Sequence, residues 1–259
     1  MTRIVICGIS GRMGRTVLRL AREQGDIEIV GGIASTADAQ VGVRVVPVER
    51  AAALIGDADV VVDFSAPAAT GALLEQAGDA IAGRALVVGT TGLGTGTSDQ
   101  LDALAARAAV LTAANFSIGV NLLLGLTRQV AAALAAADFD IEIIEAHHRR
   151  KVDAPSGTAL ALGAAAAAGR GMELERVRRD GRTGETGVRP DGEIGFHAVR
   201  AGGVVGEHRV VFAGERERVE LVHEALDGAV FADGALRAAR WLSGRGPGRW
   251  TMLDVLGLT

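Results

Sequence analysis

A basic segment in the middle of the chain holds the side chains that most readily transfer protons near neutral pH. It runs over residues 147–158 as His-His-Arg-Arg-Lys-Val-Asp-Ala-Pro-Ser-Gly-Thr. Histidine titrates near neutrality, and burial can lower the pKa of a lysine into the same range. Arginine cannot serve, because its pKa stays above about 12. The candidate proton-transfer residues are therefore the two histidines, His147 and His148, together with Lys151.

Lys151 is the only lysine among the 27 Lys and Arg residues of the chain. A bias that replaces lysine by arginine wherever either will serve explains most of this count. Such a bias also suggests that the surviving lysine occupies a position where arginine will not serve. Chance can leave one lysine as well, so the count supports the assignment of Lys151 without proving it.

The end of the same segment predicts a binding site for a carboxylate. Pro155, Ser156, Gly157 and Thr158 open a predicted helix over residues 158–168, with Ser156 as its N-cap. The first N–H groups of a helix lack acceptors within it and attract anions. A dicarboxylate can be held by this helix start at one end and by cationic side chains at the other.

Two other interpretations of residues 147–158 are a solvated basic turn and a metal site. When the run His-His-Arg-Arg-Lys is considered alone, it is as compatible with a solvated basic turn as with a catalytic segment. A metal site is disfavoured, because adjacent histidines are poorly spaced for one ion and no cysteine cluster supports them. We expect no metal. His197, His208 and His223 are expected to be structural or surface residues.

A glycine-rich loop joins the first predicted strand, residues 4–7, to the first predicted helix, residues 15–24. It comprises Gly8, Ile9, Ser10, Gly11, Arg12, Met13 and Gly14. Glycines permit a tight turn and a close approach to a pyrophosphate, which the start of the helix then binds. The spacing Gly-x-x-Gly-x-x-Gly matches the dinucleotide fingerprint only loosely, and a tight turn without a ligand is the alternative.

The end of the second predicted strand, residues 27–33, bears on the choice of cofactor. Ser35 and Thr36 stand where an acid often binds the ribose 2′-hydroxyl of NAD, and the next acid is Asp38. Either hydroxyl can bond a ribose hydroxyl or a phosphate, and Arg12 can reach a 2′-phosphate. The cofactor is therefore NADPH or NADH, with a slight preference for NADPH.

Two further loops follow strands of the same predicted sheet. Ligands bind beyond the carboxyl ends of such strands, so these loops are candidates for holding a nicotinamide ring. Ordinary turn chemistry would also explain their small residues. The candidate residues are Gly89, Thr90 and Thr91 in the first loop and Ala113, Ala114, Asn115 and Phe116 in the second.

The order of predicted elements indicates an α/β fold with two domains. Strands and helices alternate over residues 1–117, which predicts an N-terminal Rossmann-like, doubly wound parallel sheet that binds a dinucleotide. Residues 118–227 predict a C-terminal α+β domain, with a mostly antiparallel sheet, for substrate binding and oligomerisation. Residues 228–259, beginning with a helix, are expected to return to the first domain. The predicted elements are strands at 4–7, 27–33, 43–46, 59–64, 85–88, 110–112, 139–146, 193–200, 204–212 and 218–223, and helices at 15–24, 49–55, 67–78, 98–108 (N-capped by Ser98), 119–136, 158–168 and 228–242, with a mobile loop at 178–192.

Bulk composition excludes several functions. The net charge of −4 disfavours a nucleic-acid partner, which usually requires a basic surplus. No run approaches 18 apolar residues, so no membrane span is expected. The single cysteine, Cys7, fits a reducing compartment, and we expect a cytoplasmic protein.

The sequence closely resembles the dihydrodipicolinate reductase family of lysine and diaminopimelate biosynthesis, also called 4-hydroxy-tetrahydrodipicolinate reductases. The resemblance extends over essentially the whole chain. The matching runs are Gly-Arg-Met-Gly at 11–14, Asp-Phe-Ser at 63–65, Gly-Thr-Thr-Gly at 89–92, Ala-Asn-Phe-Ser-Ile-Gly-Val-Asn at 114–121, Glu-Ala-His-His at 145–148, Lys-Val-Asp-Ala-Pro-Ser-Gly-Thr-Ala at 151–159, Ile-Gly-Phe at 194–196, Val-Arg-Ala-Gly at 199–202 and Val-Gly-Glu-His at 205–208.

The resemblance implies roles for the candidate residues. His147 would be the general acid/base, Lys151 a proton donor, and His148, Gly157 and Thr158 would bind a small dicarboxylate substrate. The glycine loop and the two later loops would hold NADPH or NADH, whose hydride reduces the substrate ring. A homotetramer built through the second domain is also implied. The chain departs from many members at Ser35 and Thr36, so their cofactor preference does not carry over.

Two alternatives remain open at the level of the sequence. Another two-domain reductase of a small acid or sugar would explain the glycine loop but not the run at 151–158. A non-catalytic NAD(P)-binding protein would be expected to have lost His147 and Lys151, and both are present.

Overall fold

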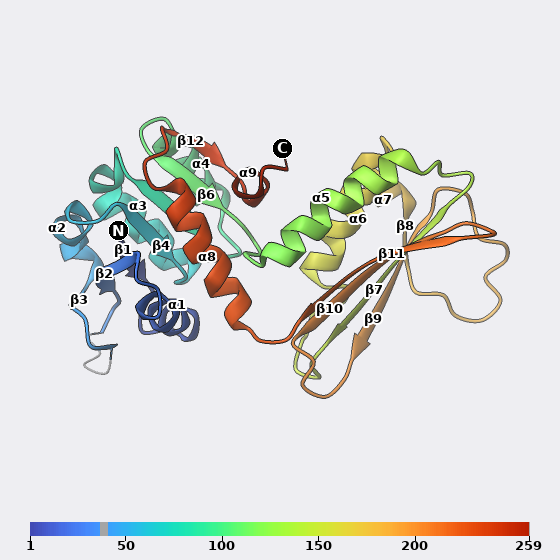
Figure 1. Ribbon diagram of the computed structural model, residues 1–259, viewed down its shortest axis with the longest axis horizontal. Helices are drawn as coiled ribbons and strands as arrows, with labels where there is room; N and C mark the ends of the chain where they lie inside the picture. The colour runs from blue at the N-terminus through green and yellow to red at the C-terminus, as the bar shows by residue number, and fades with distance from the viewer. Residues whose placement is uncertain (37–40, 259) are drawn as a thin grey trace. The chain divides into compact units, whose positions relative to one another are not determined.

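The computed structural model describes residues 1–36 and 41–258. The described chain divides into two compact units, one of Met1–Ile118 with the segment from Ala229 onward, and one of Gly119–Gly228. The domain boundaries predicted from the sequence are 117/118 and 227/228, one residue before those of the two units. Figure 1 shows both units, with α8 (Ala229–Leu242) packed among the elements of the first.

The first unit is built on one parallel sheet with the strand order β12-β6-β5-β4-β1-β2-β3 in the described chain. Omitting β12, this is the order 3-2-1-4-5-6 of a Rossmann fold, which confirms the predicted architecture. The strands are β1 (Thr2–Cys7), β2 (Ile27–Ile33), β3 (Val45–Val46), β4 (Val60–Asp63), β5 (Ala85–Val88), β6 (Ala109–Thr112) and β12 (Gly248–Trp250).

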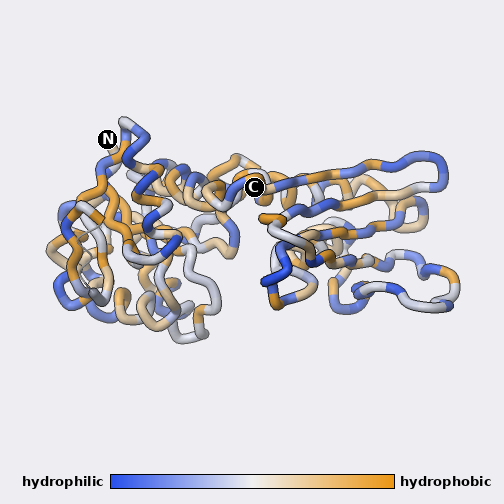
Figure 2. The backbone as a smooth tube through the Cα atoms, turned by 90° about the horizontal axis from the view of Figure 1, so that it is seen from below, coloured by the Kyte–Doolittle hydropathy of each residue, from blue (hydrophilic) through white to orange (hydrophobic). Residues whose placement is uncertain are grey.

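Both faces of this sheet are covered, because successive side chains of a strand point to opposite sides. Ile4 and Ile6 pack against α1, α8 and α9 on one face. Val5 and Cys7 pack against α2, α3 and α4 on the other. Figure 2 shows apolar stretches inside each unit and hydrophilic stretches mainly at turns and surfaces. The helical segments are α1 (Arg12–Arg22), η2 (Val48–Arg50), α2 (Ala51–Gly56), α3 (Pro67–Ile81), α4 (Thr95–Ala105), α8 (Ala229–Leu242) and α9 (Met252–Leu256).

One predicted helix start is wrong. α4 begins at Thr95 after Gly94, and Ser98 lies inside it rather than at its N-cap. The backbone N–H of Ser98 donates to the carbonyl of Gly94, which is the first intrahelical bond of the helix. Helix boundaries of this kind depend on backbone geometry that side-chain propensity specifies only weakly.

The second unit is a sheet with the order β11-β10-β7-β9-β8, packed against helices α5 and α6. β10 pairs antiparallel with β7 and β11, whereas β9 pairs parallel with β7 and β8. The sheet is therefore mixed: the predicted antiparallel pairing is found on both sides of β10, whereas the parallel pairing of β9 was not predicted. The elements are α5 (Ile118–Ala133), β7 (Asp140–His147), α6 (Gly157–Gly169), α7 (Leu174–Val177), β8 (Arg178–Asp180), β9 (Ile194–Arg200), β10 (Gly206–Ala213) and β11 (Arg218–Ala225).

The segment 178–192, predicted as a mobile loop, is anchored in the structure. It begins with β8, and two of its arginines form ion pairs with Glu142, a carboxylate on β7. Arg182 Nη2 lies 2.9 Å from Glu142 Oε1, and Arg189 Nε lies 3.1 Å from the same oxygen. His197 Nε2 adds a contact of 2.7 Å to Glu142 Oε2. This network ties the segment to the sheet.

Candidate functional site

The glycine loop after β1 is shaped by close backbone contacts. Gly8 has φ +77°, and a Cβ there would lie 2.6 Å from the carbonyl oxygen of Phe64. A Cβ on Gly14 would lie 2.2 Å from the carbonyl oxygen of Gly8. Real Cβ atoms do not approach so closely, so only glycine permits this turn. The turn leads directly into α1, whose N-cap, Gly11, offers no side-chain cap to the first N–H groups.

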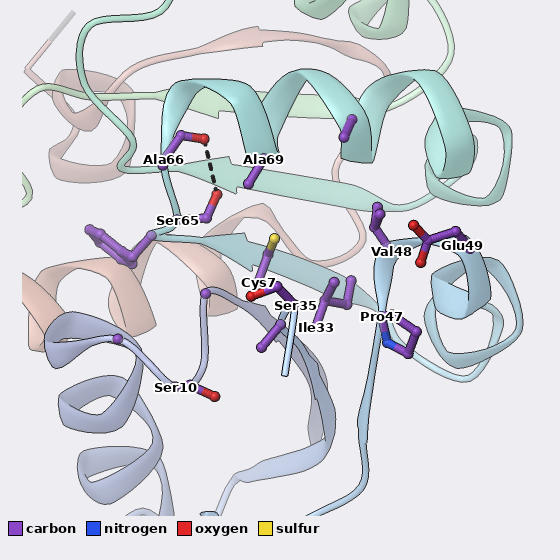
Figure 3. Close-up of a pocket in the computed structure, with 15 residues that line it drawn as sticks. Cys7, Ser10, Ile33, Ser35, Pro47, Val48, Glu49, Ser65, Ala66 and Ala69 are labelled. Carbon is purple, nitrogen blue, oxygen red and sulfur yellow. Dashed lines mark hydrogen bonds between the residues drawn. The ribbon is translucent and has the colours of Figure 1, made fainter. Parts of the chain in front are cut away.

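A cavity of about 500 Å³ opens beside this turn (Figure 3). Ser10 lies at the turn and Glu49 on the far side of the cavity in this view. The hydroxyl of Ser10 is buried without a hydrogen-bond partner among the described residues. A buried hydroxyl of this kind usually has a partner, so this one is suited to a ligand. The lining comes from Cys7, Gly8, Ser10, Gly11, Ile33, Ala34, Ser35, Pro47, Val48, Glu49, Phe64, Ser65, Ala66, Ala69 and Ala72.

The two hydroxyl residues after β2 differ in their relation to this cavity. Ser35 and Thr36 are both exposed, but only Ser35 is among the lining residues. Glu49, in the short helical segment η2, is a lining residue that sequence reasoning did not single out. Asp38 lies outside the described residues. The predicted Arg12 and Met13 form the first turn of α1.

A second cavity, of about 240 Å³, lies at the ends of β5 and β6. It is lined by the predicted residues Thr90, Thr91, Ala113 and Ala114, among others. The hydroxyl of Thr90 donates to Asp63 Oδ2, at the end of β4, at 3.2 Å, which fixes the position of its side chain. Gly89 lies against the ring of Phe64, where a Cβ would come within 2.1 Å of a ring carbon.

The last two predicted cofactor residues are engaged in local structure. Asn115 Oδ1 accepts a hydrogen bond of 2.8 Å from the backbone N–H of Ser117. The side chain of Phe116 is 2% exposed and packs edge-on against Phe64, with 5.5 Å between ring centroids. The ring of Phe116 therefore belongs to the core, and only its backbone faces the loop.

His147 lies at the end of β7, two residues after Glu145. This spacing on a strand places both side chains on one face, the face that packs on α5 and α6. His147 Nδ1 is 2.6 Å from Glu145 Oε2. Glu145 is 1% exposed and also accepts a bond of 2.9 Å from the backbone N–H of Ser156. The strand ends at His147, so the rule that successive side chains of a strand point to opposite faces does not apply to His148.

Two residues missed by the sequence analysis complete this cluster. Arg200, on β9, donates from Nη1 to Glu145 Oε2 at 2.7 Å and from Nη2 to Oε1 at 2.6 Å. His208, on β10, packs edge-on against His147 with ring centroids 5.1 Å apart. It is 4% exposed and bonds Ser156 Oγ at 3.2 Å, so of the two expectations, a structural or a surface residue, the surface position is excluded. The sequence signals for this cluster are the two-residue spacing of Glu145 and His147 and the family-matching runs at 199–202 and 205–208, which contain Arg200 and His208.

Burial and charge set the ionisation of the cluster. Burial would raise the pKa of Glu145, but hydrogen bonds from Arg200, His147 and Ser156 outweigh it and lower that pKa. Burial lowers the pKa of His147, with Glu145 opposing. Burial also lowers the pKa of His208 to about 4, with the charge of His147 contributing. The site thus combines an ionised carboxylate with two imidazoles that are neutral near pH 7.

The remaining predicted residues lie around the start of α6. Ser156 is the N-cap, and its hydroxyl accepts from the backbone N–H of Ala159, as predicted. Gly157 is exposed, with open space where a Cβ would stand, and Thr158 follows it. Lys151 Nζ is 2.9 Å from Asp153 Oδ1. His148 Nδ1 is buried without a hydrogen-bond partner in the described chain. Within residues 1–36 and 41–258, no group of His, Cys, Asp and Glu could hold a metal ion.

Two family models match the chain in succession. The model described as "Dihydrodipicolinate reductase, N-terminus" matches residues 2–116, and "Dihydrodipicolinate reductase, C-terminus" matches residues 119–256. The chain belongs to the dihydrodipicolinate reductase family. The family, the reductase class and the dependence on NAD(P)H expected from the sequence are thereby confirmed.

Similar proteins of this family match over their full length. A 4-hydroxy-tetrahydrodipicolinate reductase of Parvibaculum lavamentivorans is 48% identical, over 99% of this chain and 98% of the relative. One of Caulobacter vibrioides is 49% identical, over 98% and 97%. Among solved structures, the dipicolinate-bound dihydrodipicolinate reductase from Paenisporosarcina sp. TG-14 has a TM-score of 0.75 and 25% identity, over 98% of each chain. None of the described helices combines the length and apolar character needed to cross a membrane.

The low pKa of His208 predicts an acid-dependent loss of stability. Between its ordinary pKa of 6.5 and about 4, the unfolded chain binds a proton on His208 that the folded chain does not. Stability is therefore lost as pH falls through this window. His208→Gln, which can still bond Ser156, should lose roughly 2 kcal/mol less than the wild type between pH 7 and pH 5. Urea unfolding at both values measures this; equal losses in the two proteins would contradict it. His147 and His223 are present in both proteins, so the difference between the two losses reports chiefly the titration of His208.

Proposed function

We propose that the chain reduces 4-hydroxy-tetrahydrodipicolinate to tetrahydrodipicolinate with NADPH or NADH, in the synthesis of diaminopimelate and lysine. One observation supports this most directly. His147, Lys151 and the start of α6 are gathered around the buried Glu145–Arg200 pair, which puts proton donors beside a site for an anion. The reaction replaces a ring hydroxyl by hydrogen, so it consumes one hydride and one proton and releases water.

The first unit binds the cofactor. The turn at Gly8–Gly11 and the start of α1 bind the pyrophosphate through backbone N–H groups, with Ser10 supplying its unpartnered hydroxyl. The adenosine half occupies the 500 Å³ cavity and the nicotinamide half the loops at Thr90–Thr91 and Ala113–Ala114. Bound NAD(P)H supplies the hydride. The residues of the chain contribute binding and orientation.

The second unit binds the substrate. Gly157, at the exposed first position of α6, offers a backbone N–H to one carboxylate, with open space beside it for the ligand. Ser156 shapes this helix start and Thr158 follows it. His148, from the segment before the helix, has a buried ring nitrogen without a hydrogen-bond partner among the described residues, and we assign it to the same substrate. The solved relative was crystallised with dipicolinate, a ring with two carboxylates, and a ligand of this chemistry suits such a site.

Proton transfer falls to His147 and Lys151. Glu145 occupies Nδ1 of His147, so Nε2 is the ring nitrogen that can serve the substrate. The absence of a Cβ at Gly206 keeps space beside that atom, because a Cβ there would lie 3.2 Å from Nε2. Lys151 is the proton donor; its ion pair with the half-exposed Asp153 holds the ammonium group at the edge of the site.

We further propose a cytoplasmic homotetramer. The face of the second sheet opposite α5 and α6 carries exposed apolar side chains on three strands. Ile144 is 36% exposed, Val199 46% and Val222 50%. Large apolar groups gathered on one sheet face are typical of a protein interface, and a second sheet is the natural partner for such a face. The buried thiol of Cys7 fits a reducing compartment.

Replacing the proposed proton-transfer residues tests the proposed reaction. His147→Gln, Lys151→Met and Lys151→Arg should each lower kcat by about 10²- to 10⁴-fold, because none of the new side chains can transfer the proton. Cofactor affinity should stay within about twofold, since the cofactor residues lie in the first unit. The measurement is a coupled assay with freshly generated substrate. Arg150→Gln, at an exposed position of the same segment, is the control and should keep wild-type kcat. Unchanged turnover in the His147 and Lys151 variants would refute the proposal.

Ser35 should control the choice between the two cofactors. Ser35→Asp places a carboxylate in the wall of the adenosine cavity, where it repels a 2′-phosphate and accepts from a ribose hydroxyl. The ratio of kcat/KM for NADH to that for NADPH should rise roughly tenfold or more. Thr36→Asp, outside the lining, should shift the ratio less. Equal effects of the two changes, or none, would contradict this assignment.

The open sheet face should control assembly. Val222→Asp buries a charge in the proposed interface and should shift the protein from a tetramer toward smaller species. Light scattering at micromolar concentration measures the mass. Val188→Asp is the matched control, because Val188 is 95% exposed and lies outside the sheet. A tetramer that persists in the Val222 variant, or a wild-type monomer, would be inconsistent with this interface.

A further inference from the structure

The carboxylate of Glu145 receives hydrogen bonds from three separate elements. Its own strand, β7, brings the ring of His147 to 2.6 Å. β9 brings the guanidinium of Arg200, which bonds both carboxylate oxygens. The start of α6 brings the backbone N–H of Ser156 at 2.9 Å. A carboxylate that is 1% exposed and bonded in this way is ionised and fixed in position.

We propose that Glu145, held by Arg200, is the positioning residue for proton transfer: it selects the ring nitrogen that His147 presents to the substrate and keeps the segment of Lys151 in place. This proposal rests on the proposed function, since it concerns how the proposed acid/base is prepared. Neither residue contacts the substrate in it; both act through His147 and Lys151.

The first part of the argument concerns the tautomer of His147. An ionised carboxylate can only accept a hydrogen bond, so Nδ1 of His147 must carry the hydrogen of the 2.6 Å contact. In the neutral ring, Nε2 is then the lone-pair nitrogen, ready to take up a proton. Because both oxygens of Glu145 are held by Arg200, the carboxylate cannot rotate away and release the ring. One tautomer is therefore fixed before the substrate binds.

The second part concerns the charges that face His147. Lys151 from the following segment and Arg200 from β9 both disfavour the protonated ring, as does burial. The ring of His208 from β10, whose centroid lies 5.1 Å from that of His147, is neutral near pH 7 and so adds no charge beside His147 there. Glu145 opposes these effects and favours the protonated ring. Without Glu145, His147 would be protonated only at a lower pH.

The third part concerns Lys151. Arg200 Nη2 also donates to the carbonyl oxygen of Asp153 at 2.6 Å. Glu145 Oε1 accepts from Ser156 N, three residues further on. The pair thus holds both ends of the stretch 153–156, and Asp153 in turn holds Lys151 Nζ at 2.9 Å. Both proposed proton-transfer residues therefore depend on the same buried ion pair.

β7 supplies a matched comparison on its opposite face. Glu142 also binds a histidine and arginines: His197 Nε2 at 2.7 Å, and Arg182 and Arg189 at 2.9 and 3.1 Å. This second network anchors the segment 178–192 and contains none of the proposed proton donors. A variant of Glu142 therefore shows what the loss of a comparable network does to the protein when His147 and Lys151 keep their contacts.

The experiment compares Glu145→Gln, Glu145→Asp and Glu142→Gln in the full chain. Long-range ¹H–¹⁵N spectra of the histidine rings, assigned with His147→Gln, report the tautomer and the pKa of His147 without substrate. The coupled assay gives kcat/KM against pH, and fluorescence titration gives NADPH affinity. Glu145→Gln should mix the two tautomers of His147, lower its pKa, and reduce kcat at least about tenfold, with NADPH affinity within about twofold. Glu145→Asp keeps a carboxylate at this position, so its His147 should show a smaller share of the second tautomer than in Glu145→Gln.

Glu142→Gln should leave the His147 spectrum and the shape of the pH profile unchanged, even where it lowers stability. The double variant Glu145→Gln with Arg200→Gln leaves no buried charge unpaired. If the single variant fails to fold, the double variant tests whether the tautomer and the pKa of His147 depend on Glu145. A single tautomer and an unchanged pKa of His147 in the folded Glu145 variants would overturn the proposal. Absence of wild-type turnover would instead refute the proposed function, while the tautomer result would stand.

Discussion

The buried carboxylate of Glu145 is the interaction on which the substrate half of the molecule depends. An ionised carboxylate without water around it must be paired and hydrogen-bonded, or it is strongly destabilising. Glu145 meets this requirement with a guanidinium from β9, an imidazole from its own strand and a backbone N–H from α6. Satisfying one charge therefore links two parallel strands and the start of a helix. The position of His147 is a consequence of that constraint.

The nucleotide-binding unit contains a comparable arrangement. Asp63, fully buried at the end of β4, accepts from the hydroxyls of Thr70 at 2.5 Å and Thr90 at 3.2 Å and from the backbone N–H of Ser65 at 3.0 Å. These contacts join the loop after β4, the start of α3 and the loop after β5. In each unit, one buried carboxylate at or near the end of a strand links separate segments that a ligand must find in a fixed arrangement. The glycine turn works differently, since there it is the lack of side chains that brings the backbone close.

The errors of the sequence analysis have identifiable physical causes. A parallel pairing of β9 with β7 requires a long crossover, and α6 with the segment up to 193 provides it. Strand-like runs without intervening helices suggested hairpins instead, which is why the second sheet was expected to be mostly antiparallel. The segment 178–192 looked mobile because it is rich in glycine and arginine. Its arginines, however, find Glu142 and Asp140 across the sheet, which no local pattern could reveal. Helix α4 begins three residues before Ser98, at a glycine N-cap.

The sequence alone determined what is local. Apolar runs and glycines specified the alternating first unit, the turn at Gly8–Gly14 and the N-cap at Ser156, and the spacing of His147, Lys151 and Ser156 placed the candidate proton donors on one short segment. Tertiary structure decided what surrounds them. Arg200 reaches Glu145 across 55 residues of chain, and His208 reaches Ser156 across 52. Both arrive through the register of strands paired with β7, where His147 lies opposite Arg200 and Glu145 opposite His208. Register is set by the packing of whole strands against helices, so it leaves no mark at the residues that it brings together.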